Sequence, residues 1–80
     1  MPGYTRRAEK DLAAMPLAMQ DKARTIARRL DEEPGLGKKL KGKLQNLRSA
    51  RLGRSHRIVY AVIDGRIVVV AITDRKDAYR

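Results

Sequence analysis

The dipeptide Asp64-Gly65 stands between two apolar runs and constrains the fold of this chain more than any other feature. An Asp-Gly loop favours the tight turn whose twist matches two antiparallel strands, so the flanking runs are predicted to form a hairpin. The runs are residues 56–63 and 66–73, and both are rich in β-branched residues. A third run, at residues 47–52, precedes them. The sequence therefore predicts an antiparallel meander, in which the nearly continuous apolar run at 66–73 is central and buried on both faces.

The N-terminal third of the chain has helical periodicity instead. Thr5 is a suitable N-cap for a first amphipathic helix at about residues 6–15, and Pro16 interrupts that helix. A second amphipathic helix is predicted over residues 17–30, and the Pro34-Gly35 pair stops it. Because so short a break joins them, the two helices are predicted to form an antiparallel hairpin.

These elements predict a single α+β domain over residues 1–80, in which an N-terminal antiparallel helix hairpin packs on a three- to four-stranded antiparallel sheet. The fourth strand depends on residues 1–4, which contain Pro2 and Gly3 and make a weak edge strand. Residues 35–42 are expected to be an exposed connector. The helices cover one face of the sheet, and the other face remains for function.

Positive charge is concentrated in the C-terminal half. The chain has 19 Lys and Arg against 9 Asp and Glu, which gives a formal net charge of +10. Residues 1–34 hold seven basic and six acidic side chains, whereas residues 35–80 hold twelve basic and three acidic ones, so their net charges are +1 and +9. Basic residues are often only a solvated surface. An excess this one-sided favours a polyanionic partner, RNA above all. Binding phosphates releases their counterions, and the electrostatic field of the protein speeds its association with the nucleic acid.

The same composition excludes several kinds of site. The chain has no cysteine and one histidine, so neither a disulfide framework nor a metal site is expected, and no cofactor is predicted. There is no apolar leader and no run approaching about 18 apolar residues, so we expect no secretory signal and no membrane span, and a cytoplasmic location. Core packing rather than chemistry is assigned to Tyr4, Met15, Met19 and Tyr60.

Four short motifs follow one another in an order that resembles a known family. They are Leu-Lys-Gly at residues 40–42, Leu-Arg-Ser-Ala-Arg-Leu-Gly-Arg at 47–54, His-Arg-Ile-Val-Tyr at 56–60 and Ile-Thr-Asp-Arg-Lys-Asp-Ala-Tyr at 72–79. In this order and spacing the chain resembles, over almost its whole length, the RelE/ParE toxin superfamily of bacterial type II toxin–antitoxin modules. The resemblance implies a RelE-like toxin that a cognate antitoxin neutralises by wrapping over the basic sheet surface.

The resemblance also implies roles for individual residues. Arg57 matches the family's strand arginine that stabilises the phosphate, Arg75 matches the arginine of the last strand, and Tyr79 matches a tyrosine a few positions later. These three are the predicted catalytic residues. Guanidinium groups suit phosphoryl chemistry because the extra negative charge develops in the transition state. Nearby arginines make the Tyr79 phenol a stronger acid for proton transfer, and its alternative role is to stack on an RNA base.

A second set of residues is predicted to bind RNA or phosphate. It comprises Lys41, Lys43, Arg48, Arg51, Arg54 and His56. Arg51 and, less closely, Arg48 stand where the family often has a basic residue on the preceding strand. His56 competes with Tyr79 as the acid or base, although a lone histidine is more often structural.

The resemblance implies one of two activities. RelE-like members cut mRNA in the ribosomal A site without a metal, by attack of a ribose 2′-OH on the adjacent phosphate. ParE-like members instead act on DNA gyrase. Because the two arginines and the tyrosine occur together, the sequence favours a ribosome-dependent, metal-independent mRNA endoribonuclease that inhibits translation. The alternatives are a ParE-like gyrase inhibitor and a catalytically inactive basic module that only binds nucleic acid.

Overall fold

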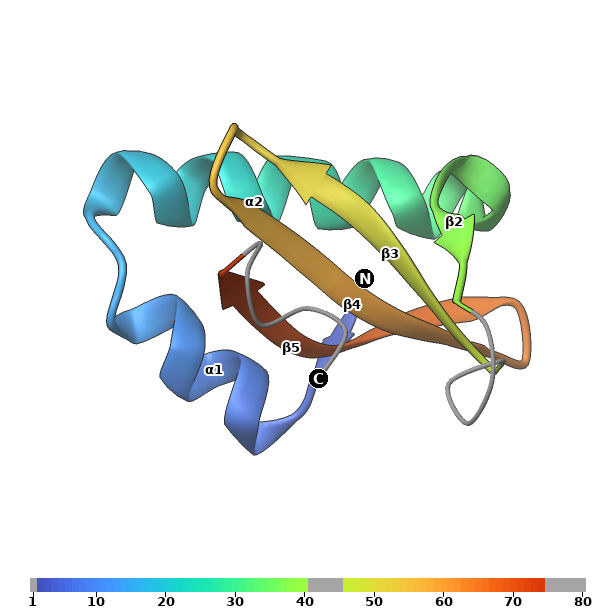
Figure 1. Ribbon diagram of the computed structural model, residues 1–80. Coiled ribbons are helices and arrows are strands. Elements are labelled where there is room, and N and C mark those ends of the chain that lie inside the picture. Colours follow the sequence, from blue (N-terminus) through green and yellow to red (C-terminus); the bar gives the residue numbers. More distant parts are fainter. Residues whose placement is uncertain (1, 41–45, 75–80) are drawn as a thin grey trace.

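The computed structural model describes residues 2–40 and 46–74 of the chain (Figure 1). In chain order the elements are β1 (Gly3–Tyr4), α1 (Arg6–Ala13), α2 (Leu17–Glu32), the short 3₁₀ helix η1 (Pro34–Leu36), β2 (Lys38–Lys39), β3 (Leu47–Leu52), β4 (His56–Ile63) and β5 (Arg66–Asp74). The predicted α+β class and the helix pair packed on a sheet are confirmed. Four predicted site residues, Lys41, Lys43, Arg75 and Tyr79, lie outside the described residues.

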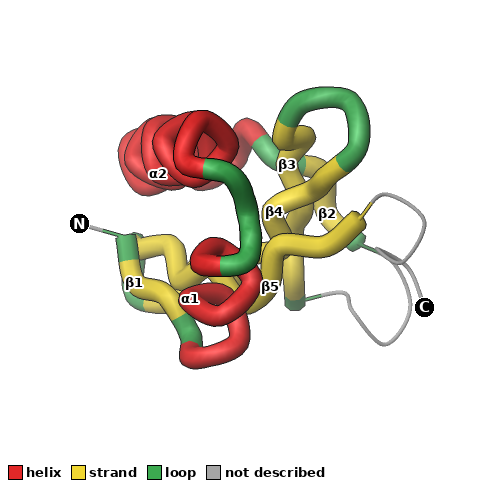
Figure 2. Tube along the Cα trace, turned by 90° about the vertical axis from the view of Figure 1, so that its left-hand side faces the viewer, coloured by secondary structure: helices red, strands yellow, loops and turns green. Residues whose placement is uncertain are grey.

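Within the described ranges the strands form one five-stranded sheet in the order β1-β5-β4-β3-β2. Strands β2 to β5 pair antiparallel with their neighbours, whereas β1 pairs parallel with β5. Both helices lie on the same side of β3, β4 and β5 (Figure 2), where they bury one continuous apolar core. This arrangement leaves the other side of the sheet uncovered by either helix.

The local signals in the sequence account for most element boundaries. The Thr5 side chain caps α1 by accepting a hydrogen bond of 3.1 Å from the Ala8 N–H, as predicted. Helix α1 ends at Ala13, two residues earlier than predicted, and α2 continues two residues further, to Glu32. The hairpin turn is confirmed, because Asp64 and Gly65 have φ values of 51° and 79°, the left-handed conformation that this tight turn requires.

The prediction that the last strand is an interior strand buried on both faces is confirmed, but it is not the middle strand of the five. Strand β4 is central, and β5 lies between β4 and the two-residue strand β1. Burial explains the apolar run: Ile67 and Val69 of β5 face the helices, whereas Ala71 is buried on the opposite face. The apolar run therefore indicates that the strand is buried on both faces of the sheet. A strand next to the edge strand can be buried in this way as well as the middle strand.

Two elements were missing from the sequence prediction. The segment expected to be an exposed connector contains η1 and the short strand β2, which pairs with β3. Residues 1–4, a weak candidate for an edge strand, supply β1. The sheet consequently has one strand more than the largest number predicted.

Helix carboxylates protect the part of the β5 edge that β1 is too short to cover. The Ile67 N–H donates to Asp31 Oδ1 of α2 at 3.2 Å, and the Ile72 N–H donates to Asp11 Oδ2 of α1 at 3.0 Å. Unpaired edge groups invite pairing with other chains, so these contacts shield the strand as well as anchor the helices. In the part of the chain that the structure describes, no helix combines the length and hydropathy needed to cross a bilayer.

A tyrosine fixes the start of β2 against the sheet. Tyr60 is fully buried, and its hydroxyl donates to the Pro34 carbonyl at 2.8 Å while accepting from the Gly37 N–H at 2.9 Å. Arg48 Nη1 donates to the Gly37 carbonyl at 2.9 Å, so both backbone groups of this glycine are bound by side chains of the sheet. The prediction that Tyr60 lies in the core is confirmed, and its hydroxyl also positions β2.

Candidate functional site

The candidate site is the sheet face opposite the helices, called the open face. Its residues are Lys38, Leu40, Leu47, Ser49, Arg51, Arg57, Val59, Ala71 and Thr73. Successive residues of a strand alternate between the two faces of a sheet. Ile58 and Tyr60 are buried under the helices, so Arg57 and Val59 point the other way.

One row across the open face is polar and cationic. Arg51 of β3 stands directly opposite Arg57 of β4, and Arg57 stands directly opposite Thr73 of β5. Residues in such pairs have Cβ atoms about 4.5–5.5 Å apart, which brings two guanidinium groups within reach of one phosphate. Like charges placed opposite each other destabilise a sheet, and an anion bound between them removes that repulsion.

The rest of the open face is apolar. Leu40, Val59 and Ala71 form a second buried cluster, and the partly buried Leu47 packs against it. The open face therefore combines a buried apolar cluster with a cationic row at one end, and that row suits a partner that has anionic groups.

Two hydroxyl groups on the open face are buried without a hydrogen bond. Ser49 is 2% exposed, and neither its Oγ nor the Oγ1 of Thr73 has a hydrogen-bond partner among the described residues. Leaving a buried hydroxyl unsatisfied costs free energy.

Sheet geometry separates some of the predicted site residues from Arg57. Arg48 stands opposite Tyr60, on the helix side of β3, and its guanidinium group binds the Gly37 carbonyl. His56 precedes Arg57 in β4 and so points to the opposite side, where its Nδ1 lies 2.8 Å from Ser55 Oγ. Of the predicted residues on β3 and β4, Arg51 and Arg57 thus share the open face, and Arg48 and His56 do not.

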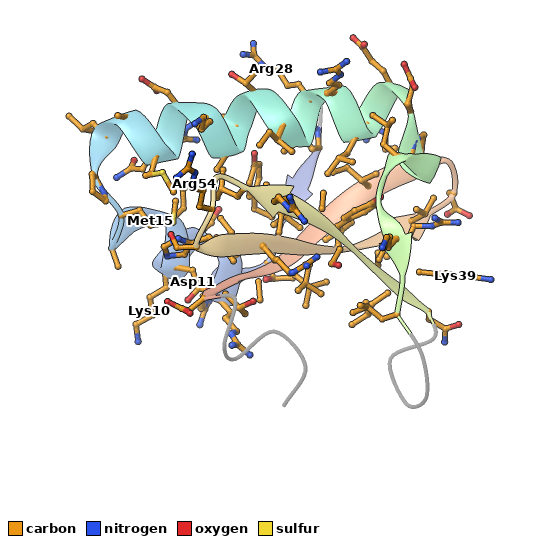
Figure 3. The ribbon with its side chains drawn as sticks, turned by 45° about the horizontal axis from the view of Figure 1, so that its top comes forward. Lys10, Asp11, Met15, Arg28, Lys39 and Arg54 are labelled. Carbon is orange, nitrogen blue, oxygen red and sulfur yellow. The ribbon has the colours of Figure 1, made fainter. Side chains whose placement is uncertain are left out.

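Arg54 lies in the turn between β3 and β4 and is exposed (Figure 3). Arg75 and Tyr79 follow the last described residue, Asp74, so their convergence with Arg57 stays a prediction. Among residues 2–40 and 46–74 no group of three or more His, Cys, Asp or Glu side chains is placed to hold a metal ion.

Sequence reasoning missed Lys38, Ser49 and Thr73 as residues of this face. Lys38 stands opposite Ser49 because β2 pairs with β3, but a Lys-Lys dipeptide gives no strand signal. Thr73 stands opposite Arg57 because β5 contains one extra residue, Val70: the consecutive residues Val59 and Tyr60 pair with Ala71 and Val69. Such a bulge has no clear sequence signal in a run of valines.

Solved structures similar to this chain include a toxin and chains of toxin–antitoxin complexes. A chain of the RelBE2 toxin–antitoxin complex from Mycobacterium tuberculosis matches with a TM-score of 0.82 and 28% identity, over 94% of this chain and 96% of that chain. A chain of the YoeB-YefM complex from Staphylococcus aureus matches with a TM-score of 0.79 and 23% identity, covering 91% and 93%. The isolated RelE toxin from E. coli matches with a TM-score of 0.76 and 21% identity, covering 99% and 89%.

The fold is therefore that of the RelE/ParE toxin superfamily, as the sequence resemblance implied. Residues 3–79 match the family model described as the ParE toxin of the type II toxin–antitoxin system parDE, so the chain belongs to this toxin family. Comparison with proteins of curated function gives no match.

Proposed function

We propose that this toxin is a ribosome-dependent, metal-independent mRNA endoribonuclease and that the open face is its RNA-binding surface. The observation that carries the proposal is the cross-strand pair of Arg51 and Arg57, with Thr73 next in the same row. Two guanidinium groups in one row on a helix-free face suit the oxygens of a single phosphate. The net charge of +9 over residues 35–80 favours a nucleic acid as the source of that phosphate.

The proposed reaction needs no metal or cofactor. The ribose 2′-oxygen attacks the adjacent phosphorus, the bond to the following 5′-oxygen breaks, and the products are a 2′,3′-cyclic phosphate and a 5′-hydroxyl. The proton lost by the 2′-hydroxyl goes to a base, and the leaving oxygen receives one from an acid. Negative charge on the phosphorus oxygens is greatest in the transition state. The fixed guanidinium groups of Arg57 and Arg51 therefore bind the transition state more tightly than the ground state, which accelerates the step.

Family resemblance supplies the remaining roles. Arg75 is the proposed third transition-state guanidinium, and Tyr79 is the proposed proton donor or stacking platform. His56 points to the other side of β4 from Arg57, so we assign it no proton transfer at this phosphate. Tyr79→Phe and Tyr79→Ala separate the two roles of the phenol: proton transfer is lost in both variants, whereas stacking survives in the first.

The direct test is a cleavage map of mRNA by primer extension in a reconstituted translating system. Arg57→Ala is expected to lower the cleavage rate at least about 100-fold, the usual effect of removing one donor to a developing oxyanion. Arg66→Ala is the matched control, since Arg66 is an exposed arginine at the far end of the same hairpin. Cleavage by the Arg57 variant at the parental rate would remove the site assignment, provided that its circular dichroism and thermal unfolding match those of the parent.

We also propose a cognate antitoxin as protein partner. The similar structures from M. tuberculosis and S. aureus are described as toxin–antitoxin complexes. The open face presents cationic side chains, of which Lys38 and Arg51 are exposed, so it suits an antitoxin segment with acidic residues. An antitoxin that binds there protects Arg57 from RNA. Cleavage that continues unchanged at saturating antitoxin contradicts this placement.

Gyrase inhibition is the second candidate function, because the family model that matches residues 3–79 is that of the ParE toxins. A supercoiling assay with purified gyrase distinguishes the candidates. Inhibition of supercoiling without any mRNA cleavage would replace the endoribonuclease proposal with this one.

A further inference from the structure

A pocket lies between β1 and α2, on the helix side of the sheet and therefore away from the open face. Its volume is about 460 Å³. Pro2 and Tyr4 line it from the N-terminal strand region, and Asp21, Arg24, Thr25 and Arg28 line it from α2. The volume is within the range of small-molecule sites, about 300–1,000 Å³.

The pocket contains two arginines for which no ion pair is found among residues 2–40 and 46–74. Arg24 and Arg28 are one turn apart on α2, and no carboxylate of the described residues forms an ion pair with either. Like charges four residues apart on a helix repel each other. Figure 3 shows Arg28 projecting from α2 away from β3, whereas Arg54 lies on the other side of that helix. An anion bound between Arg24 and Arg28 relieves their repulsion.

Tyr4 contributes an aromatic ring and a protonated phenol. Burial raises the pKa of the Tyr4 phenol above its usual value, and Arg24 and Arg28 act in the opposite direction because their charges favour the phenolate. Burial dominates, so the phenol keeps its proton at neutral pH and can donate a hydrogen bond.

Asp21 gives the pocket an acceptor as well as donors. Its carboxylate lines the same space, and the Thr25 hydroxyl donates to the Asp21 carbonyl at 2.9 Å. A polyacidic peptide would meet repulsion at this carboxylate. Ribose hydroxyls and the exocyclic amino groups of bases instead need an acceptor there.

We infer that this pocket binds one nucleotide unit, with its phosphate on Arg24 and Arg28, its base against the Tyr4 ring and a hydroxyl or amino group on Asp21. Arginine pairs suit phosphate, and aromatic rings stack on bases of any sequence. The ligand is either a free nucleotide or a nucleotide within an RNA chain, since both present the same groups. The pocket and the open face are on different sides of the sheet, so the inference does not depend on the proposed cleavage activity.

The test is a titration of the purified full chain with adenosine 5′-monophosphate, followed by the backbone amide signals in NMR spectra. We expect the signals of Tyr4, Thr25 and Arg28 to shift together along one binding curve, which differs from the curve of any shift at Arg51 and Arg57 on the open face. The paired substitution Arg24→Gln and Arg28→Gln is expected to weaken binding at least about tenfold, because it removes the charge-assisted hydrogen bonds to phosphate.

The matched control is the paired substitution Lys22→Gln and Arg29→Gln, which removes the same charge from exposed positions of the same helix. We expect this control to change the affinity for the nucleotide by less than about threefold, because it alters only the long-range effect of net charge. Inorganic phosphate should bind more weakly than the nucleotide, because it gains nothing from Tyr4 or Asp21.

Two further probes identify the source of the nucleotide. If a tetranucleotide RNA shifts the same signals more strongly than adenosine 5′-monophosphate does, the pocket recognises RNA. If the tetranucleotide binds equally or more weakly, the ligand is a free nucleotide. Both results support the site. Absence of shifts at the pocket with millimolar nucleotide and RNA overturns the inference. So does equal weakening by the two paired substitutions, or tighter binding of a hexaglutamate peptide at these residues.

Discussion

Gly37 is a position where a side chain has no room. A Cβ atom there would overlap the Tyr60 hydroxyl and lie 2.7 Å from the Ser49 carbonyl oxygen. Gly37→Ala is therefore expected to lower the free energy of unfolding by about 1–3 kcal/mol, since either Tyr60 or the backbone of β3 must move. Gly35→Ala is the control, because nothing lies within 4 Å of a Cβ at that position. Equal denaturant midpoints for the two variants would contradict the close approach.

The Tyr60 hydroxyl gives a second prediction for the same contact. Tyr60→Phe leaves the buried Gly37 N–H without its partner, so we expect a loss of about 1–3 kcal/mol in the free energy of unfolding. Tyr4→Phe should change it by less than about 0.5 kcal/mol, because the Tyr4 hydroxyl makes no hydrogen bond within residues 2–40 and 46–74. Urea unfolding of both variants measures the difference, and similar losses in the two would show that the phenol of Tyr60 has no special role.

Burial of Tyr60 could be predicted from its sequence, but the partners of its hydroxyl could not. Tyr60 lies in an apolar run, which predicts a core position. Its partners Pro34 and Gly37 are 26 and 23 residues away along the chain. A single sequence contains no signal for a contact at that separation, so the role of Gly37 becomes visible only when the strands are assembled.

At the level of elements, the β5 edge depends on helix carboxylates. Asp11→Ala removes the acceptor of the Ile72 N–H, so we expect the Ile72 amide to exchange with solvent faster and the free energy of unfolding to fall by about 1–3 kcal/mol. The ion pair of Asp11 with Arg7 adds little, since the Arg7 side chain is 70% exposed and the charged atoms are 3.7 Å apart.

Two controls isolate that hydrogen bond. Arg7→Ala removes the ion pair and keeps the acceptor, and Glu9→Ala removes an exposed carboxylate of the same helix. Both should leave hydrogen exchange at Ile72 almost unchanged. If Arg7→Ala accelerates that exchange as much as Asp11→Ala does, the stabilisation is electrostatic and the edge contact is not its source.

Element boundaries were predictable where a local signal exists, and the register across strands was not. The bounds of β3 and β4 coincide with the predicted runs. Asp64-Gly65 fixes the end of β4, because it forms the hairpin turn between β4 and β5. Continuing that hairpin without a bulge would place Ile72 opposite Arg57. The extra residue Val70 shifts the register, so Thr73 takes that place. The polar row of the open face therefore results from an irregularity that hydrophobic periodicity cannot reveal.

For the molecule as a whole, the two faces of the sheet divide its arginines. Alternation along β4 places Arg57 on the same face as Val59, and the register between β3 and β4 places Arg51 on that face too. The same alternation assigns Arg48 to the helix side, where it binds Gly37. Net charge alone does not distinguish Arg48, Arg51 and Arg57. The sequence therefore predicted that a basic surface exists, but not which arginines belong to it.

Salt dependence of RNA binding tests that division, with single-stranded RNA and the whole chain. If Arg51 contacts a phosphate on the open face, Arg51→Gln removes one phosphate contact and should reduce the slope of log K against log salt concentration by about 1. Arg48→Gln should leave the slope unchanged, because the Arg48 guanidinium group is already hydrogen-bonded within the fold. Both variants lose one charge, so a shared effect of net charge changes both slopes equally. A smaller slope for Arg51→Gln alone locates the phosphate on the open face, and a smaller slope for Arg48→Gln alone moves it to the helix side of β3.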